Sequence, residues 1–315
     1  MNSRLAVKLL LNCFFLLTCP IYSVPLYFCS GANSTYFPQL LNLIGSIHRI
    51  NFETLQEIAV FDLGLNSNEI DHLKTIQKVT LHKLEQTNPD ILTPFSRLGW
   101  FSWKPVAIKQ ALDRFPYVLW VDAGTVVLRP LDDLFAYIDH HGYFLSTIGD
   151  ETINDVVQHP LRYGATKNVI DTFDLNSPEK NWILSQELIM GGLLGVSRSK
   201  KIYNNFVMPL YTFAHDIKNF EDDGTTPNGY GTAMHDQTLI TIQTYLNSLL
   251  FHRQDFTQER AIYLTINSQP VPFYITWHTN YVCDKTHIFN CRKGAHRFRF
   301  EDSIRYITSQ PKPRL

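Results

Sequence analysis

Residues 117 to 131 read YVLWVDAGTVVLRPL, a short apolar run followed by an acid and a glycine. All five residues from Tyr117 to Val121 are apolar or aromatic. A run this short and this apolar predicts a strand that is buried on both faces of a mainly parallel sheet. Asp122 would lie where the strand leaves the sheet, and Gly124 would allow a sharp turn. Open α/β sheets bind ligands just outside the carboxyl ends of their strands, where an acid can hold a divalent cation and, through it, a phosphate.

Strand and helix patterns alternate on both sides of this run. Such alternation predicts βαβ units with right-handed crossovers, and therefore a mainly parallel sheet flanked by helices. The stretch from Phe220 to Met234 is rich in Gly, Asp, Asn and Thr and is predicted to be a mobile loop. The predicted strands are 25–30, 57–63, 78–84, 117–122, 143–147 and 189–196, and the predicted helices are 36–47, 68–75, 105–112, 200–217 and 236–246.

The first 23 residues have the pattern of a signal peptide. Arg4 and Lys8 precede an apolar run of about 11 residues, which is shorter than the roughly 20 residues needed to span a bilayer. The small residue Ser23 follows as a cleavage position. We therefore expect residues 1–23 to direct the chain into the secretory pathway, to a secreted or lumenal location, or to the periplasm or exterior of a bacterium. A membrane association is expected only if this segment stays uncleaved.

The length and the net charge of the chain limit its possible number of domains and its possible partners. Residues 24–315 are predicted to form one domain, because a single large α/β domain accommodates a chain of this length. The formal net charge is −1, so electrostatics do not favour a nucleic acid polymer as the main partner. In an oxidising compartment Cys283 and Cys291 are close enough in sequence to form a disulfide over a short loop.

Four segments, in the same order along the chain, resemble the nucleotide-diphospho-sugar glycosyltransferases of the GT-A type, with family 8 and its uncharacterised relatives as the nearest match. In that family a buried strand ends in Asp-x-Asp, and the preceding and following segments resemble those of this chain. The similarity covers roughly Leu26 to His278. The segments are GWFSWKPVAIKQAL at 99–112, the strand ending at Asp122, QELIMGGLLGV at 186–196 and HDQTLI at 235–240.

The resemblance implies a GT-A-like Rossmann-type fold and a hexosyltransferase-like activity that moves a sugar from a nucleotide-diphosphate donor, a UDP-sugar first among them. The acceptor, a glycan or a protein, is left open, and so is retention or inversion. Asp236 and Gln237 would lie beside the anomeric carbon as catalytic residues. The donor-binding residues would be Lys104, Asp122, Gly124, Gly191 and Gly192.

The metal motif departs from the family pattern. The chain has Asp122-Ala123-Gly124, so one acid stands where the family has two. The resemblance implies a divalent cation, Mn²⁺ first, held by Asp122 and by His278 as a late histidine ligand. A single carboxylate replaces less of the ion's water than a pair does, so metal affinity should be weaker and donor binding should depend more on cations such as Lys104 or Arg253.

Two other functions fit parts of the sequence. The missing second acid also suits a catalytically inactive glycan- or nucleotide-binding protein on the same fold, since fold alone does not establish activity. A dinucleotide-dependent oxidoreductase would share the alternating first half. However, Ser30-Gly-Ala-Asn33 after the first strand has one glycine where the dinucleotide fingerprint has three.

Overall fold

A computed structural model describes residues 24–93, 97–127, 129–147, 152–153, 156–157, 160–252, 254–255, 261–266, 269–273, 275–277 and 300–307. Its centre is a six-stranded sheet in the order β3-β2-β1-β4-β9-β6. The first four of these strands are parallel, whereas β9 is antiparallel to both β4 and β6. Their bounds are β1 Leu26–Ala32, β2 Leu55–Asp62, β3 Val79–Lys83, β4 Tyr117–Val121, β6 Tyr143–Phe144 and β9 Leu193–Ser197.

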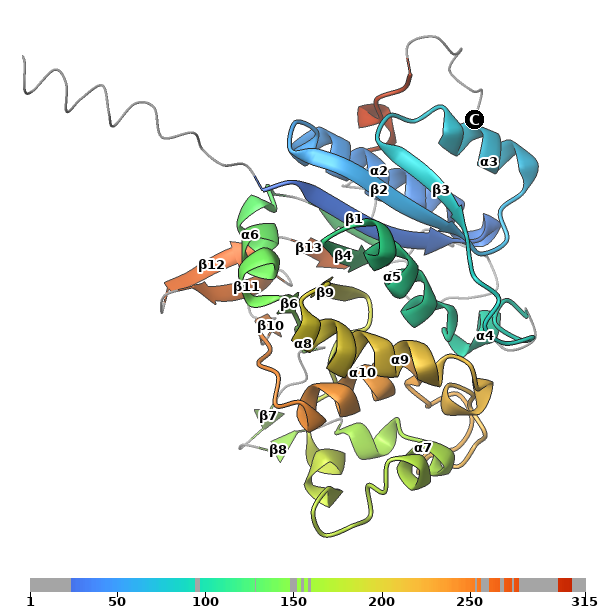
Figure 1. The fold of residues 1–315 in the computed structure, drawn as a ribbon, viewed down its shortest axis with the longest axis vertical. Helices are drawn as coiled ribbons and strands as arrows, with labels where there is room; N and C mark the ends of the chain where they lie inside the picture. The colour runs from blue at the N-terminus through green and yellow to red at the C-terminus, as the bar shows by residue number, and fades with distance from the viewer. Residues whose placement is uncertain are drawn as a thin grey trace, which may run out of the picture.

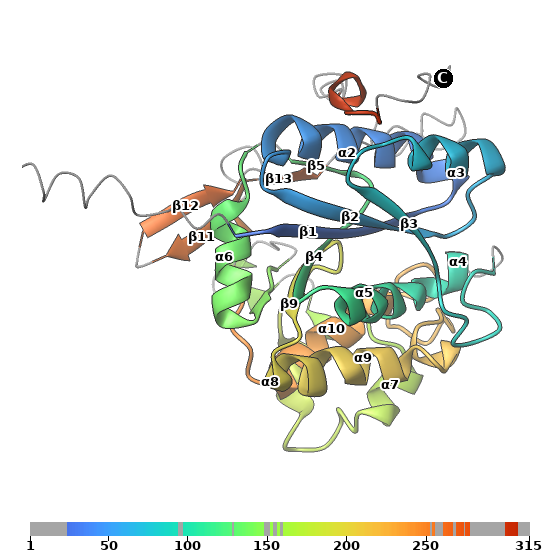
Figure 2. The same cartoon turned by 45° about the horizontal axis from the view of Figure 1, so that its top comes forward.

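Helices cover both faces of this sheet (Figures 1 and 2). One face carries α2 and α6, and the other carries α5, α9 and α10. The predicted α/β architecture, a mixed and mainly parallel sheet between helices, is confirmed. The helices are α2 Phe37–Asn51, α3 Ser67–Lys74, α4 Arg97–Trp100, α5 Trp103–Arg114, α6 Asp132–His141, α7 Lys167–Thr172, α8 Lys200–Ile202, α9 Met208–Phe213 and α10 His235–Leu246.

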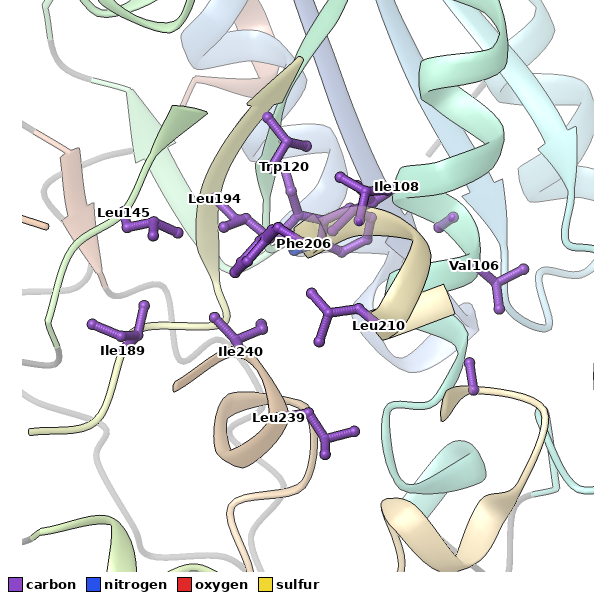
Figure 3. Close-up of a cluster of buried hydrophobic side chains, with 14 of the residues drawn as sticks. Val106, Ile108, Trp120, Leu145, Ile189, Leu194, Phe206, Leu210, Leu239 and Ile240 are labelled. Carbon is purple, nitrogen blue, oxygen red and sulfur yellow. The ribbon is translucent and has the colours of Figure 1, made fainter. Parts of the chain in front are cut away.

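The strand β4 is buried along its whole length, as its apolar run predicts. Alternate side chains of a strand point to opposite faces, so β4 contributes to two hydrophobic cores. Val118 and Trp120 belong to the core under α5, α9 and α10, whereas Leu119 and Val121 belong to the core under α2. Figure 3 shows Trp120 at the centre of the first core, beside Leu194 and Phe206.

The chain order places a switch point next to β4. From β1 the chain moves outward to β2 and β3, and it then returns to the other side of β1 to form β4. The connection from β1 to β2 runs through α2 on one face of the sheet, whereas the connection from β3 to β4 runs through α5 on the other face, and ligands bind at such switch points in open α/β sheets. Asp122 follows β4 directly and lies at this point.

Three smaller strand groups complete the described structure. The short strand β5 (Thr125–Val127) pairs antiparallel with β13 (Ile275–Trp277), so that Trp277 lies opposite Thr125. The remaining groups are β7 (Thr152–Ile153) with β8 (Val156–Val157), and β10 (Gln254–Asp255) with β11 (Ala261–Ile266) and β12 (Gln269–Phe273).

Two predicted elements differ in detail. The helix predicted over 200–217 ends at Phe213 and contains a π-helical turn, Tyr203–Val207, between α8 and α9. The segment 220–234 is a loop, as its composition predicts, and within it the buried Asp222 carboxylate accepts hydrogen bonds from the backbone N–H groups of Gly224 and Gly231. Composition predicts the loop but not the buried aspartate that organises it.

The predicted signal peptide 1–23 and the predicted Cys283–Cys291 pair fall outside the described residues. In the described part of the chain, none of the helices has the length and apolar character needed to cross a membrane.

A segment near the end of the chain packs against α2. Residues 300–307 include the short 3-10 helix Glu301–Ser303, and Phe300 donates its N–H to Asn42 Oδ1 at 2.7 Å. The Arg305 N–H is donated to Nδ1 of the buried His48 at 3.0 Å. A Cβ on Gly45 would lie 1.9 Å from the Phe300 carbonyl oxygen, so this contact between α2 and the segment requires glycine.

Candidate functional site

The site begins with Asp122, at the carboxyl end of β4. Its backbone N–H is donated to the Gly192 carbonyl at 2.9 Å, which continues the antiparallel pairing of β4 with β9. Its Oδ1 accepts a hydrogen bond of 2.7 Å from Trp120 Nε1. Trp120 and Asp122 are two residues apart on an extended segment, so their side chains leave on the same face. The Asp122 side chain remains 41% exposed, which makes it accessible to a ligand.

Lys104, in the first turn of α5, connects Asp122 to two other parts of the chain. Its Nζ lies 3.3 Å from Asp122 Oδ1 and 2.8 Å from Asp236 Oδ2, and it donates to the Gly191 carbonyl at 3.1 Å. An ammonium group has three N–H donors, and here three acceptors surround it. The Lys104 side chain is 4% exposed, so it is an internal counter-ion rather than a surface charge.

The surroundings of Lys104 combine charge and aromatic rings. Burial alone would lower the pKa of the Lys104 ammonium, but the nearby carboxylates of Asp122 and Asp236 outweigh this effect and raise that pKa above its ordinary value. The rings of Phe101, Trp103 and Trp120 lie 5.7, 5.8 and 5.8 Å from Nζ. Cation–π attraction adds to the two ion pairs. Lys104 therefore stays protonated inside the protein.

Asp236 and Gln237 come from the first turn of α10. Asp236 is buried against Lys104, whereas Gln237 is half-buried. Both adjoin Gly191, where an added Cβ would lie 2.4 Å from Asp236 Oδ2 and 3.0 Å from Gln237 Cγ. The absence of a side chain at Gly191 is what allows α10 to approach the end of β4. The N-cap residue Met234 makes no side-chain hydrogen bond to the helix.

The chain before Lys104 is strained. Leu98, Gly99, Trp100 and Phe101 have φ angles of 58°, 61°, 50° and 65°, so this turn is left-handed. Each non-glycine residue in such a conformation costs roughly 1–2 kcal/mol. Trp100 and Phe101 contact the ring of His235, itself at φ 40°, with centroid distances of 5.1 and 5.6 Å. Strained backbone of this kind clusters at functional sites.

The structure brings most of the predicted site residues together. Lys104, Asp122, Gly191, Gly192 and Asp236 are joined by the contacts above, and Gln237 adjoins Gly191. The contact of Lys104 with a donor phosphate stays a prediction, and in the structure its ammonium lies beside three protein oxygens in a buried position.

Gly124 does lie in a tight turn, as predicted, because the Thr125 N–H is donated to the Asp122 carbonyl at 3.0 Å. Its φ is not positive, and an added Cβ would find no atom within 4 Å, so its backbone does not require glycine. His278 and Arg253 lie outside the described residues, although β13 ends at Trp277, one residue before His278.

Trp120 and the Gly191 carbonyl were missed as parts of the site. The spacing of Trp120 and Asp122 on one strand face was a usable signal for the first. The second depends on a contact between segments 87 residues apart, which no local pattern indicates.

The described donors do not fit the divalent cation that the resemblance implies. No group of three His, Cys, Asp or Glu side chains in the described ranges is arranged to hold a metal ion. Asp236 Oδ2 and Asp122 Oδ1 both face the Lys104 ammonium, which already neutralises one of their two charges. The residues that the structure describes therefore support a site based on an internal ammonium.

Comparison with known proteins gives only distant similarities. No protein-family model and no curated protein matches this chain. Among solved structures, core-mannan synthase A from Aspergillus fumigatus, a Mn/GDP form, is 10% identical, with 78% of this chain and 75% of that chain covered and a TM-score of 0.46.

Two further solved structures show the same level of similarity. The mannosyltransferase Ktr4p from S. cerevisiae, in complex with GDP, is 8% identical over 75% of this chain and 71% of its own, with a TM-score of 0.46. Mouse xyloside xylosyltransferase 1 is 12% identical over 74% and 86%, with a TM-score of 0.43. These values describe a distant similarity in the path of the backbone.

The close approach at Gly191 gives a first prediction. Gly191→Ala should push the Asp236 carboxylate away from Lys104 and lower the free energy of unfolding by about 1–3 kcal/mol, the usual cost of overpacking. Gly124→Ala is the matched control, because its new methyl group meets nothing within 4 Å. Urea denaturation of both variants measures the difference. Equal midpoints for the two variants would show that Gly191 is not required for the contact.

Proposed function

We propose that this protein is a glycosyltransferase that takes a nucleotide-diphospho-sugar donor, a UDP-sugar first among the candidates. The observation that carries the proposal is the convergence of Asp122 and Asp236 on Lys104 at the switch point of the sheet. Charged groups that are buried and held by one another beside a ligand-binding crevice are typical of active sites. The sequence resemblance around the same residues supports the reaction class.

The half-exposed carboxylate of Asp122 would accept hydrogen bonds from hydroxyl groups of the donor, on its ribose or its sugar. Trp120 and Lys104 both bind Oδ1 and therefore fix the orientation of this carboxylate. Hydrogen bonds to a charged group contribute about 1.5–3 kcal/mol each. Asp122 would thus position the donor, and Lys104 would position Asp122.

The first turn of α10 would serve the reacting end of the donor. Gln237 adjoins Gly191, and its amide offers both a donor and an acceptor to the sugar or to the departing diphosphate. The amino end of a helix carries a partial positive charge, which favours an anion there. Asp122, Asp236 and Lys104 sum to a charge of −1, so a diphosphate also needs positive charge from elsewhere, and the predicted contact Arg253 lies outside the described residues.

The acceptor would be a hydroxyl group of a glycan or a protein, attacking the anomeric carbon as the diphosphate leaves. We further propose that residues 1–23 deliver the chain to the secretory pathway, on the basis of their charge and apolar pattern.

A thermal-shift panel of nucleotide sugars, with and without manganese, tests the proposal. A donor at 100 times its Kd should stabilise the folded state by about 2.7 kcal/mol. Release of nucleoside diphosphate on addition of an acceptor would then demonstrate transfer. Nucleotide binding with neither transfer nor hydrolysis would instead identify a binding protein on this fold, and no binding by any nucleotide sugar would contradict the proposal.

A further inference from the structure

Lys104 occupies a point where three oxygen atoms converge. Its Nζ lies 2.8 Å from Asp236 Oδ2, 3.1 Å from the Gly191 carbonyl oxygen and 3.3 Å from Asp122 Oδ1. The oxygens come from α10, from the segment before β9 and from the end of β4. Carboxylate and carbonyl oxygens are also the ligands that Mg²⁺, Ca²⁺ and Mn²⁺ prefer. Three oxygens of this kind could surround a metal ion, but here they surround the ammonium group of Lys104.

We propose that the Lys104 ammonium is a tethered cation that prevents Asp122 and Asp236 from holding a divalent metal, so that the cleft binds its donor without a metal on these carboxylates. The donor half of this inference rests on the proposed function. The exclusion of metal from the two carboxylates does not, because it depends only on contacts within the protein.

The burial of the ammonium is the first argument. Mg²⁺ and similar small cations keep several water ligands when proteins bind them. The Lys104 side chain is 4% exposed, and three aromatic rings lie within 6 Å of its Nζ, so the intact site has little room for a hydrated ion. A lysine head group, in contrast, needs only three acceptors and tolerates aromatic walls.

Charge is the second argument. A metal ion on the outward oxygen of Asp122 would lie beside the ammonium, and the repulsion between two cations in a partly buried site is stronger than in water. Asp236 could not relieve this repulsion, since its buried carboxylate is engaged by the same ammonium at 2.8 Å. Among the residues that the structure describes, Asp122 would then be the one carboxylate left for the ion, and one carboxylate is a weak ligand set for a hard cation.

Removing the ammonium should therefore create a metal site. In Lys104→Ala the three oxygens would remain around a vacated space, and they would need to move inward by roughly 0.5–1 Å to reach the usual metal–oxygen distances. Lys109→Ala is the matched control, because Lys109 lies on the same helix and pairs with Asp113 at 2.9 Å near the surface.

The experiment is a Mn²⁺ titration, by calorimetry, of the nucleotide-free wild type, Lys104→Ala and Lys109→Ala. We expect Lys104→Ala to bind Mn²⁺ at least about 100-fold more tightly than the wild type, with a Tm that rises on addition of Mn²⁺, because two carboxylates bind a hard cation much better than one. Lys109→Ala should behave as the wild type. A wild type that binds Mn²⁺ as tightly as Lys104→Ala would overturn the proposal.

If Lys104→Ala does not fold without metal, two measurements still decide the matter. Refolding of this variant in Mn²⁺ but not in EDTA would support the tethered cation. In the wild type, Mn²⁺ binding that disappears in Asp122→Asn would overturn it, and the lack of any Asp122-dependent binding would support it. These titrations contain no nucleotide. A failure of all nucleotide sugars to bind would therefore count against the proposed function, while the metal titration would still decide the role of Lys104.

Discussion

Asp122→Asn should lower the rate of sugar transfer by about 100-fold, which corresponds to about 3 kcal/mol for a hydrogen bond to a charged group. The amide is the same size as the carboxylate and keeps an oxygen that can accept from Trp120 Nε1. What it loses is the negative charge of a half-exposed side chain. The measurement is kcat/KM for nucleoside diphosphate release with the donor identified by the thermal-shift panel.

Stability separates a role in binding from a role in folding. The pair of Asp122 with Lys104 is partly exposed on the aspartate side, so its loss should shift the Tm by only a few degrees. Asp113→Asn is the matched control, because Asp113 is a similarly exposed partner of a lysine on the same helix. Unchanged transfer by Asp122→Asn would remove Asp122 from the proposed donor site. A collapse of the Tm would make Asp122 a structural anchor instead.

The local sequence predicted those strands and helices whose own residue pattern determines which of their side chains are buried. The five apolar residues of β4 predicted burial on both faces, and the predicted strands and helices before Asp122 agree with β1 to β4 and with α2, α3 and α5 within a few residues. The interior of the later helix 200–217 was not predictable, because a π-helical turn leaves no clear residue pattern. The left-handed turn at residues 98–101 was equally hidden, since Leu98, Trp100 and Phe101 all disfavour positive φ.

The composition of the site was easier to predict than its connections. Asp122, Asp236 and Lys104 were each singled out, yet the sequence gives no sign that Lys104 pairs with both acids. That contact joins α5 to the first turn of α10, 132 residues further along the chain, and it depends on how both helices pack against the same face of the sheet. Long-range packing of this kind makes Lys104 a buried counter-ion of both acids.

The packing of residues 300–307 on α2 should make folding sensitive to acid through His48. This side chain is fully buried on α2, and its Nδ1 accepts the Arg305 N–H, so the neutral ring is the form that fits. Burial, reinforced by the positive charge of Arg305, lowers the pKa of His48 from 6.5 to about 4. Between these values the unfolded chain binds a proton that the folded chain does not. The stability contributed by neutral His48 is therefore complete above pH 6.5 and is lost as the pH falls toward 4.

The lowered pKa of His48 gives the expected size of this loss of stability. Each unit of pKa difference is worth about 1.4 kcal/mol, so His48 should cost the wild type about 3 kcal/mol of unfolding free energy between pH 7 and pH 4. His252 has a pKa lowered to about 4 by burial and by His141, and it titrates over the same range, so the wild-type curve alone does not isolate His48.

His48→Gln isolates the effect, because glutamine keeps a hydrogen-bond acceptor for Arg305 but does not titrate. Urea denaturation at pH 7, 5.5 and 4 should show a shallower loss of stability in His48→Gln than in the wild type, with the difference between the two proteins shrinking by about 3 kcal/mol. His215→Gln serves as the control, since His215 is an exposed histidine whose ring hydrogen-bonds to the backbone carbonyls of Tyr211 and Thr212 in its own turn.

Parallel pH profiles for the wild type and His48→Gln would mean that the proton enters the folded protein at His48 as readily as it enters the unfolded chain. The contact with residues 300–307 would then tolerate a charged ring, and acid sensitivity would have to come from His252 and the other buried histidines.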